Sequence, residues 1–354
     1  MTLTHNQKAA FAITALLFAS LACHAATRLI IPDTPTPQPT STATPIIPTL
    51  TPFLPPTATP TIEYVASCPL VLDQIIKDST SSNENALSGE SSSGKDVTYI
   101  VQYTVSGDEI KNPLFESVPN KLKTEQKDFA AHEEIWKYFT RLIPAEQRAL
   151  LDSFSIITDG KYNILAGVNQ SDRDPYKWEL NVDFADAKEK NILTFTLLHE
   201  FGHLLTLNAD QEKVNLAIYH NPGDDTIYKR EVAACPQYFT GEGCSNPDSY
   251  INQFFDRFWT DFYAEWQKID EIKNEDTRQN QLDGFYKTYQ DQFLTDYAPT
   301  SPAEDIAESW AFFILAPKPE DTSIANEKLL FFYEYPELIQ LRAQILNRIC
   351  VEFQ

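Results

Sequence analysis

The segment that most constrains this chain of 354 residues is His199-Glu200-Phe201-Gly202-His203. On a helix, two histidines four residues apart project from the same face, one turn from each other. Their imidazoles can then converge on one ion, and zinc binds histidine nitrogen at about 2.0–2.1 Å. Glu200 lies one step round the helix, where it can accept a proton from an activated water and pass it to a leaving amine. The segment therefore predicts a helix that holds one Zn²⁺ and carries a general base.

The pattern His-Glu-x-x-His also occurs by chance, on helices whose histidines bind no metal. Here the surrounding helix is otherwise apolar, with residues that require burial: Ile192, Phe195, Leu198 and Leu205. Two histidines and a glutamate on a buried helix are unfavourable unless a partner satisfies them. The context therefore favours the metal interpretation over two ordinary histidines.

A catalytic zinc has three protein ligands and a water, so a third ligand is expected downstream. In the metzincin spacing it would be a histidine at position 209, which is Ala209. Glu304 and Glu308 lie four residues apart on one face of an otherwise apolar helix. One of them can bind the ion while the other orients a ligating histidine. A site that used both would have four protein ligands and would be structural.

The downstream segment Glu304-Asp305-Ile306-Ala307-Glu308 is preceded by Tyr297, seven residues before Glu304. In this respect the chain resembles the gluzincin peptidases related to anthrax lethal factor and the bacterial Pro-Pro endopeptidases. In those proteins the His-Glu-x-x-His helix is followed by a helix that reads roughly Glu-Phe-Phe-Ala-Glu, with a tyrosine at the same spacing. The similarity covers about residues 178–313.

The resemblance implies a role for six residues: His199, His203 and Glu304 as zinc ligands, Glu200 as general base, Tyr297 as hydrogen-bond donor to the oxyanion, and Glu308 as a partner of a ligand. The stretch between His203 and Glu304 is longer than in those relatives. Neither their substrate preference nor their specificity for Pro-Pro bonds is therefore implied.

The first 22 residues are typical of a signal peptide, with Lys8 followed by an apolar run from Ala9 to Ala22 that is too short to span a bilayer. Cys23 follows Ser20-Leu21-Ala22, which resembles a lipoprotein signal whose cysteine is lipidated. Simple secretion is the alternative, because Ser20 stands where such signals usually carry leucine. Residues 23–61 form a Thr/Pro-rich linker, and we expect the folded domain over 62–354. The predicted location is extracellular or at the cell surface, with membrane anchoring through Cys23.

Four further cysteines, an even number in an exported chain, favour disulfides. Three pairings are possible. We expect Cys235–Cys244, which closes a short loop, and Cys68–Cys350, which joins the two ends of the folded part. A thiolate metal site is the weaker interpretation because the chain has no Cys-x-x-Cys pair, and free buried thiols are the remaining alternative.

Hydrophobic periodicity predicts an α+β protein, in which a small mixed sheet packs on the active-site helix and the C-terminal half is mostly helical. Strands are expected over 97–105, 154–158, 162–168 and 178–184. Helices are expected over 123–142, 148–152, 188–207, 250–269, 278–294, 303–315 and 336–350. Residues 78–96 are expected to be a mobile loop, and the aromatic residues of 254–266 to pack in the core. His132 is expected on a solvated helix face. His220 is expected in a turn, and a place along the cleft is the weaker alternative for it.

The net charge of −22 argues against a nucleic-acid partner and against adhesion to anionic lipid headgroups. Together these features predict an exported zinc-dependent endopeptidase of zincin-like fold that acts on proteins or peptides. The alternative is a cell-surface interaction protein that keeps the zincin fold without proteolysis. Glu200 argues against that alternative, because a binding module has no need for a general base beside the metal.

Overall fold

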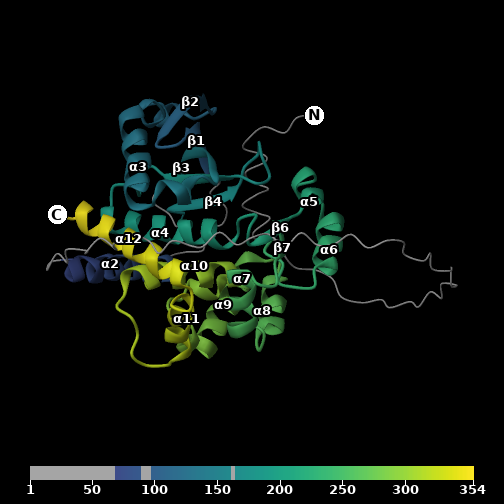
Figure 1. The fold of residues 1–354 in the computed structure, drawn as a ribbon. Coiled ribbons are helices and arrows are strands. Elements are labelled where there is room, and N and C mark those ends of the chain that lie inside the picture. Colours follow the sequence, from purple (N-terminus) through teal and green to yellow (C-terminus); the bar gives the residue numbers. More distant parts are fainter. Residues whose placement is uncertain (1–67, 89–96, 161–163) are drawn as a thin grey trace, which may run out of the picture. The chain divides into compact units, whose positions relative to one another are not determined.

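The computed structural model describes residues 68–88, 97–160 and 164–354 (Figure 1). The signal peptide, Cys23, the linker and the expected start of the domain at residue 62 lie outside these residues. The described part is α+β, as the sequence predicts. None of its helices has the length and apolar character needed to cross a membrane.

One five-stranded mixed sheet contains most of the β-structure. Its strands lie in the spatial order β2 (Glu109–Phe115), β1 (Thr98–Ser106), β3 (Leu151–Thr158), β5 (Trp178–Asp183) and β4 (Ala166–Gln170). β3 and β5 are parallel, and the other neighbours are antiparallel. β4 is therefore an edge strand, and its residues 166–168 fall within the strand expected over 162–168.

The sequence does not predict β2, the other edge strand. Its residues are mostly exposed and include Glu109, Lys111 and Pro113, so the strand lacks the alternation of apolar residues that marks a half-buried strand. Pairing with β1 through the turn at Gly107, which has a φ of 65°, holds it in the sheet. An edge strand of this composition depends on its neighbour for its structure.

Two helices pack on the apolar face of the sheet: α3 (Phe129–Leu142) and α4 (Lys190–Thr206). Trp136 and Phe139 of α3 and Leu197 of α4 lie in one buried cluster with Phe154 of β3. The helix expected from residue 123 begins at Phe129, where the Asp128 side chain accepts a hydrogen bond from the Ala131 N–H. The expected helix over 148–152 is instead a 3₁₀ turn, Ala145–Arg148, that leads into β3.

His132 is buried rather than solvated, which corrects the sequence-based expectation. Its two ring nitrogens lie 2.7 Å from the Tyr103 hydroxyl and 2.9 Å from the Glu125 carbonyl oxygen, and its ring packs edge-on against Phe184. Burial lowers the pKa of this imidazole. The polar neighbours along α3 suggested an exposed face, whereas a tyrosine from a distant strand satisfies the buried ring.

The C-terminal half is helical, as expected, with more breaks than the periodicity indicated. Its helices are α7 (Tyr250–Phe258), α8 (Tyr263–Asp270), α9 (Glu275–Tyr289), α10 (Pro302–Leu315), α11 (Ile324–Phe332) and α12 (Pro336–Glu352). The helix expected over 250–269 divides into α7 and α8. Its aromatic residues are core residues, since Phe254, Trp259 and Trp266 are buried. α11 was not predicted.

The segment between α4 and α7 contains small elements that the sequence did not predict: β6 (Glu212–Val214), α5 (Leu216–His220), α6 (Asp225–Ala234) and β7 (Gly243–Ser245). The expected disulfide Cys235–Cys244 joins the end of α6 to β7. His220 ends α5, is exposed, and contacts the ring of Tyr219. No described contact connects it to the histidines of α4.

α2 (Cys68–Ser88) shows that the expectation of a loop from residue 78 was wrong, because the helix continues through Ser88. Ser and Asn are weak helix formers, but such propensities are only a weak predictor of where a helix ends. Cys68 is bonded to Cys350 of α12, as expected, and Asp78 accepts a 2.6 Å hydrogen bond from Asn191 of α4. Both contacts hold α2 against the helices that follow the sheet.

Asp270, the last residue of α8, has a buried carboxylate whose Oδ2 lacks a hydrogen-bond partner within the described part of the chain. Burial is the main cause that raises its pKa to about 7, and Arg278 opposes the shift. Below about pH 4 this carboxyl is protonated in both the folded and the unfolded chain and does not lower stability. As the pH rises towards 7, the unfolded chain releases the proton more readily than the folded chain, so the free energy of unfolding falls. Because three pKa units correspond to about 4 kcal/mol, this value is the upper bound on the stability lost through Asp270.

We therefore expect Asp270→Asn to raise the free energy of unfolding at pH 8 by about 1–3 kcal/mol, with a gain that shrinks as the pH falls to 4. Urea unfolding at both pH values measures it. The exposed neighbour Asp261 supplies the control, because Asp261→Asn should change stability little at either pH. If Asp270→Asn raised the free energy of unfolding equally at pH 4 and pH 8, the result would contradict a raised pKa for Asp270.

Candidate metal centre

The centre lies where α4 and α10 pack against each other, with α4 also in contact with β4 (Figure 1). Gly202 allows the close approach of the two helices: a Cβ atom at this position would lie 3.0 Å from Ala307 Cα and 3.1 Å from Trp310 Cδ1. Ser301 begins α10 as its N-cap by accepting a hydrogen bond from the Glu304 N–H at 3.1 Å, and Pro302 occupies the first turn. The carboxylate of Glu304 is thereby presented to the histidines of α4.

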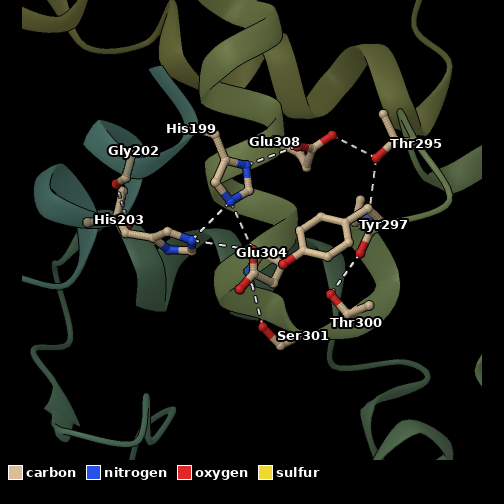
Figure 2. Close-up of polar contacts among 11 residues, drawn as sticks. His199, Gly202, His203, Thr295, Tyr297, Thr300, Ser301, Glu304 and Glu308 are labelled. Carbon is tan, nitrogen blue, oxygen red and sulfur yellow. Dashed lines mark hydrogen bonds and ion pairs between the residues drawn. The ribbon is translucent and has the colours of Figure 1, made fainter. Parts of the chain in front are cut away.

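Figure 2 shows three donor atoms that converge between these helices. His199 Nε2 lies 2.9 Å from Glu304 Oε2 and 3.1 Å from His203 Nε2. The third distance, from His203 Nε2 to Glu304 Oε2, is 3.3 Å. Both histidines are buried, and Glu304 is partly buried.

This donor set fits zinc. Ligand atoms bound to one tetrahedral zinc at about 2.0–2.2 Å lie about 3.3–3.5 Å from one another. The three observed distances are close to that spacing, and two imidazoles with one carboxylate are a combination that catalytic zinc sites use. His199, His203 and Glu304 would therefore hold the ion, with a fourth position left for water or substrate.

The structure distinguishes the roles of Glu304 and Glu308. Glu308 lies on the other side of the His199 ring, where its Oε1 is 2.9 Å from Nδ1 (Figure 2). Its Oε2 accepts a 2.7 Å hydrogen bond from Thr295. Both oxygens are therefore engaged away from the three donor atoms. This position suits Glu308 to orient His199.

The charges of the candidate centre favour a cation. Burial alone would raise the pKa of Glu304, but the positive charge and hydrogen bonds of His203 and His199 hold it well below its usual range. Burial alone would lower the pKa of His199, but Glu304 and Glu308 raise it well above the usual value. A proton on His199 therefore competes with metal, so that zinc affinity should fall as the pH falls.

Glu200 is buried, interacts electrostatically with His199, His203 and Glu304, and is not one of the three converging donors. Burial raises the pKa of its carboxyl, while His199, His203 and the backbone N–H of Val168 act in the opposite direction. Val168 belongs to β4, so the carboxylate faces the edge strand of the sheet. A carboxylate with a raised pKa near the donors is suited to accept and return a proton near neutral pH.

Tyr297 lies at the rim of the centre, with its ring centroid 5.9 Å from that of His199 (Figure 2). The residue as a whole is 42% exposed, while its hydroxyl is close to the carboxylates of the centre. Desolvation of the hydroxyl and then the charges of Glu304 and Glu200 raise its pKa. The turn that carries Tyr297 is held by Thr300, which donates to the Tyr297 carbonyl at 2.8 Å, and by Trp266, which donates to the Pro299 carbonyl at 3.0 Å.

The structure thus brings together all six residues singled out in the sequence. Three further residues contribute and were not predicted: Val168, Gly202 and Thr295. The first acts through its backbone and the second through its lack of a side chain, so neither carries a chemical signal in the sequence. No protein-family model, curated protein or solved structure matches this chain.

The contact at Gly202 predicts a specific effect of a single methyl group. In an exposed helix, Gly→Ala stabilises by about 1 kcal/mol, but in a packed interface an added methyl destabilises by about 1–3 kcal/mol. We expect Gly202→Ala to lower the free energy of unfolding by about 1 kcal/mol and to weaken zinc binding, because α10 must move away from α4. Chemical denaturation and zinc titration measure the two effects.

The matched control is Gly284→Ala in the interior of α9, where an added Cβ meets no atom within 4 Å. This variant should be more stable than the wild type by up to about 1 kcal/mol and bind zinc unchanged. Equal stabilisation by the two substitutions would show that α4 and α10 do not constrain each other at Gly202.

Proposed function

We propose that this protein is a zinc-dependent endopeptidase of the gluzincin type. The observation that carries the proposal is the convergence of His199 Nε2, His203 Nε2 and Glu304 Oε2 at 2.9–3.3 Å, with the buried carboxylate of Glu200 beside them. Metal binding alone would not require a buried carboxylate that is near the donors and is not one of them.

Each group of the centre has a separate role in the hydrolysis of a peptide bond. Bound zinc would supply a Lewis acid that polarises the scissile carbonyl and lowers the pKa of a water. Glu200 accepts the proton of the attacking water and delivers it to the amine that leaves. The Tyr297 hydroxyl donates a hydrogen bond to the oxygen that becomes negative during attack.

The sheet supports a peptide as the substrate. In the described part of the chain, β4 pairs with β5 on one side only. Its other edge can hydrogen-bond an extended peptide, the mode of recognition known as strand addition. Because Val168 of β4 contacts Glu200, a peptide on this edge would pass beside the general base.

The cellular setting is part of the proposal. Two disulfides favour an oxidising compartment, in agreement with the signal peptide expected over 1–22. Lipidation of Cys23 and a linker over 23–61 would hold the domain away from a membrane surface. The substrate would then be a protein or peptide outside the cell, and the acidic chain would have no nucleic-acid partner.

The proposal is tested by incubating the purified full chain with an unbiased peptide library and measuring its zinc content. We expect about one zinc per chain, internal cleavage of peptides, loss of cleavage with a chelator, and recovery on addition of zinc. A chain that holds zinc and cleaves no member of the library would favour the interaction protein. A chain that binds no zinc would overturn the metal centre itself.

A further inference from the structure

Thr295 is a buried residue that precedes the turn of Tyr297, and it is not one of the three residues whose donor atoms converge. Its hydroxyl makes two hydrogen bonds, one to each side. Oγ1 lies 2.7 Å from Glu308 Oε2 and 3.2 Å from the backbone nitrogen of Ala298 (Figure 2). The hydroxyl therefore lies between the Tyr297 turn and the carboxylate that contacts His199.

The direction of these hydrogen bonds follows from chemistry. A backbone N–H can only donate, so Thr295 Oγ1 accepts from Ala298 and its own hydrogen is free to point at Glu308. Glu308 then receives one hydrogen bond on each oxygen, from Thr295 on Oε2 and from His199 Nδ1 on Oε1. When His199 binds zinc as the neutral imidazole with its hydrogen on Nδ1, the lone pair of Nε2 faces Glu304 and His203.

The other histidine of the centre, His203, has no comparable hydrogen bond within the described residues. His203 Nδ1 is buried and has no hydrogen-bond partner among the described residues. The orientation of the histidine pair by hydrogen bonds therefore depends on His199 and on the groups behind it. Partners of this kind fix the ring and tautomer of a ligating histidine.

We propose that Thr295 is a positioning residue that sets the tautomer and ring orientation of His199 and, through Ala298, the position of the Tyr297 turn. The inference rests on the proposed zinc centre and adds a residue that acts on two parts of it at once. Loss of the hydroxyl would leave Glu308 Oε2 and the Ala298 N–H buried without partners, and both would rearrange to find them. A methyl group at the same place would fill the space but could not restore the hydrogen bonds.

The test compares Thr295→Val, which removes the hydroxyl, with Thr295→Ser, which keeps it, in the full chain. Zinc affinity is measured by competition with a chromophoric chelator. We expect Thr295→Val to bind zinc about 10–100-fold more weakly and Thr295→Ser to bind within about 3-fold of the wild type. Thr295→Ala removes the same hydroxyl without placing a methyl beside polar groups. If Thr295→Val does not fold, the zinc affinity of Thr295→Ala tests the role of the hydroxyl.

The matched control is Thr300→Val, which removes another hydroxyl from the same turn. Thr300 contacts the Tyr297 carbonyl and no group bonded to His199, so its loss should leave zinc affinity unchanged. The absorption spectrum of the Co²⁺-substituted protein gives a second readout, since rotation of the His199 ring changes the ligand field. We expect this spectrum to change in Thr295→Val and to match the wild type in Thr295→Ser.

With a cleaved peptide, Thr295→Val should lower kcat while KM stays within about 3-fold, because displacement of Tyr297 affects the transition state more than substrate binding. A folded Thr295→Val or Thr295→Ala with wild-type zinc affinity and Co²⁺ spectrum overturns the role of Thr295 and leaves the peptidase proposal intact. Weakened zinc binding in a chain that cleaves no peptide supports Thr295 and overturns the peptidase. A wild-type chain without zinc overturns both.

Discussion

Replacement of Glu200 by glutamine is expected to lower kcat/KM for peptide hydrolysis by about 10³-fold or more while zinc content stays at that of the wild type. Glutamine has nearly the same shape as glutamate, but its amide cannot accept and return a proton. A 10³-fold loss corresponds to about 4 kcal/mol of transition-state stabilisation. The three donor atoms come from His199, His203 and Glu304, so the substitution removes none of them.

The measurement pairs steady-state kinetics on a cleaved peptide with metal analysis of the same samples. Glu189→Gln is the matched control, because Glu189 is an exposed glutamate at the start of the same helix and makes no side-chain cap. It should retain wild-type kinetics. Wild-type activity in Glu200→Gln would remove the general base from the mechanism, and loss of zinc would show that Glu200 supports the metal directly.

Replacement of Lys328 by methionine is expected to lower the free energy of unfolding by about 3–5 kcal/mol. Lys328 of α11 is fully buried, and its Nζ lies 2.6 Å from Asp305 Oδ2 on α10. The indole of Trp259 donates to the same oxygen at 2.8 Å, and Nζ lies 4.1 Å from the ring centroid of Phe293. Burial raises the pKa of Asp305 and lowers the pKa of Lys328, and in each case the charge of the partner opposes the effect of burial.

The double variant Lys328→Met/Asp305→Asn separates two causes of lost stability. One is the loss of the ion pair, and the other is the cost of leaving one buried charge without a partner. It removes both charges and keeps a partner for Trp259, so most of the lost stability should return. The exposed pair Arg257–Glu334, at 2.6 Å, supplies the control: Arg257→Met should change stability by less than about 1 kcal/mol. Urea unfolding of the four proteins decides the matter, and equal losses at the two pairs would contradict the importance of burial.

The buried ion pair and the candidate metal centre both involve α10. Asp305 is the neighbour of Glu304 along this helix, so the buried pair with Lys328 holds one face of α10 while Gly202 and Ala307 meet on another. Rotation of α10 by one residue would replace Glu304 with a different side chain at the metal centre. The zinc affinity of Lys328→Met, where it folds, should therefore fall together with its stability.

The sequence by itself determined those features that depend on neighbours close in the chain. The spacing of His199, Glu200 and His203 sets their relation on any helix, and the apolar residues around them indicate burial. The short loop of Cys235–Cys244 made its disulfide predictable. Alternation and helical periodicity were enough for an α+β class with most strands before α4 and helices after it, because each of these signals is contained within one element.

The tertiary structure alone decided what depends on residues far apart in the chain. Spacing placed Glu304 and Glu308 on one face and left their roles open. The contact of α10 with Gly202 directs Glu304 to both Nε2 atoms and Glu308 to Nδ1 of His199. His132 is buried because Tyr103 of a distant strand satisfies it. β2 is a strand because β1 pairs with it, and Thr295 has a role only because the Tyr297 turn lies against α10. In each case the deciding hydrogen bond or packing contact comes from a different element, and no local pattern encodes it.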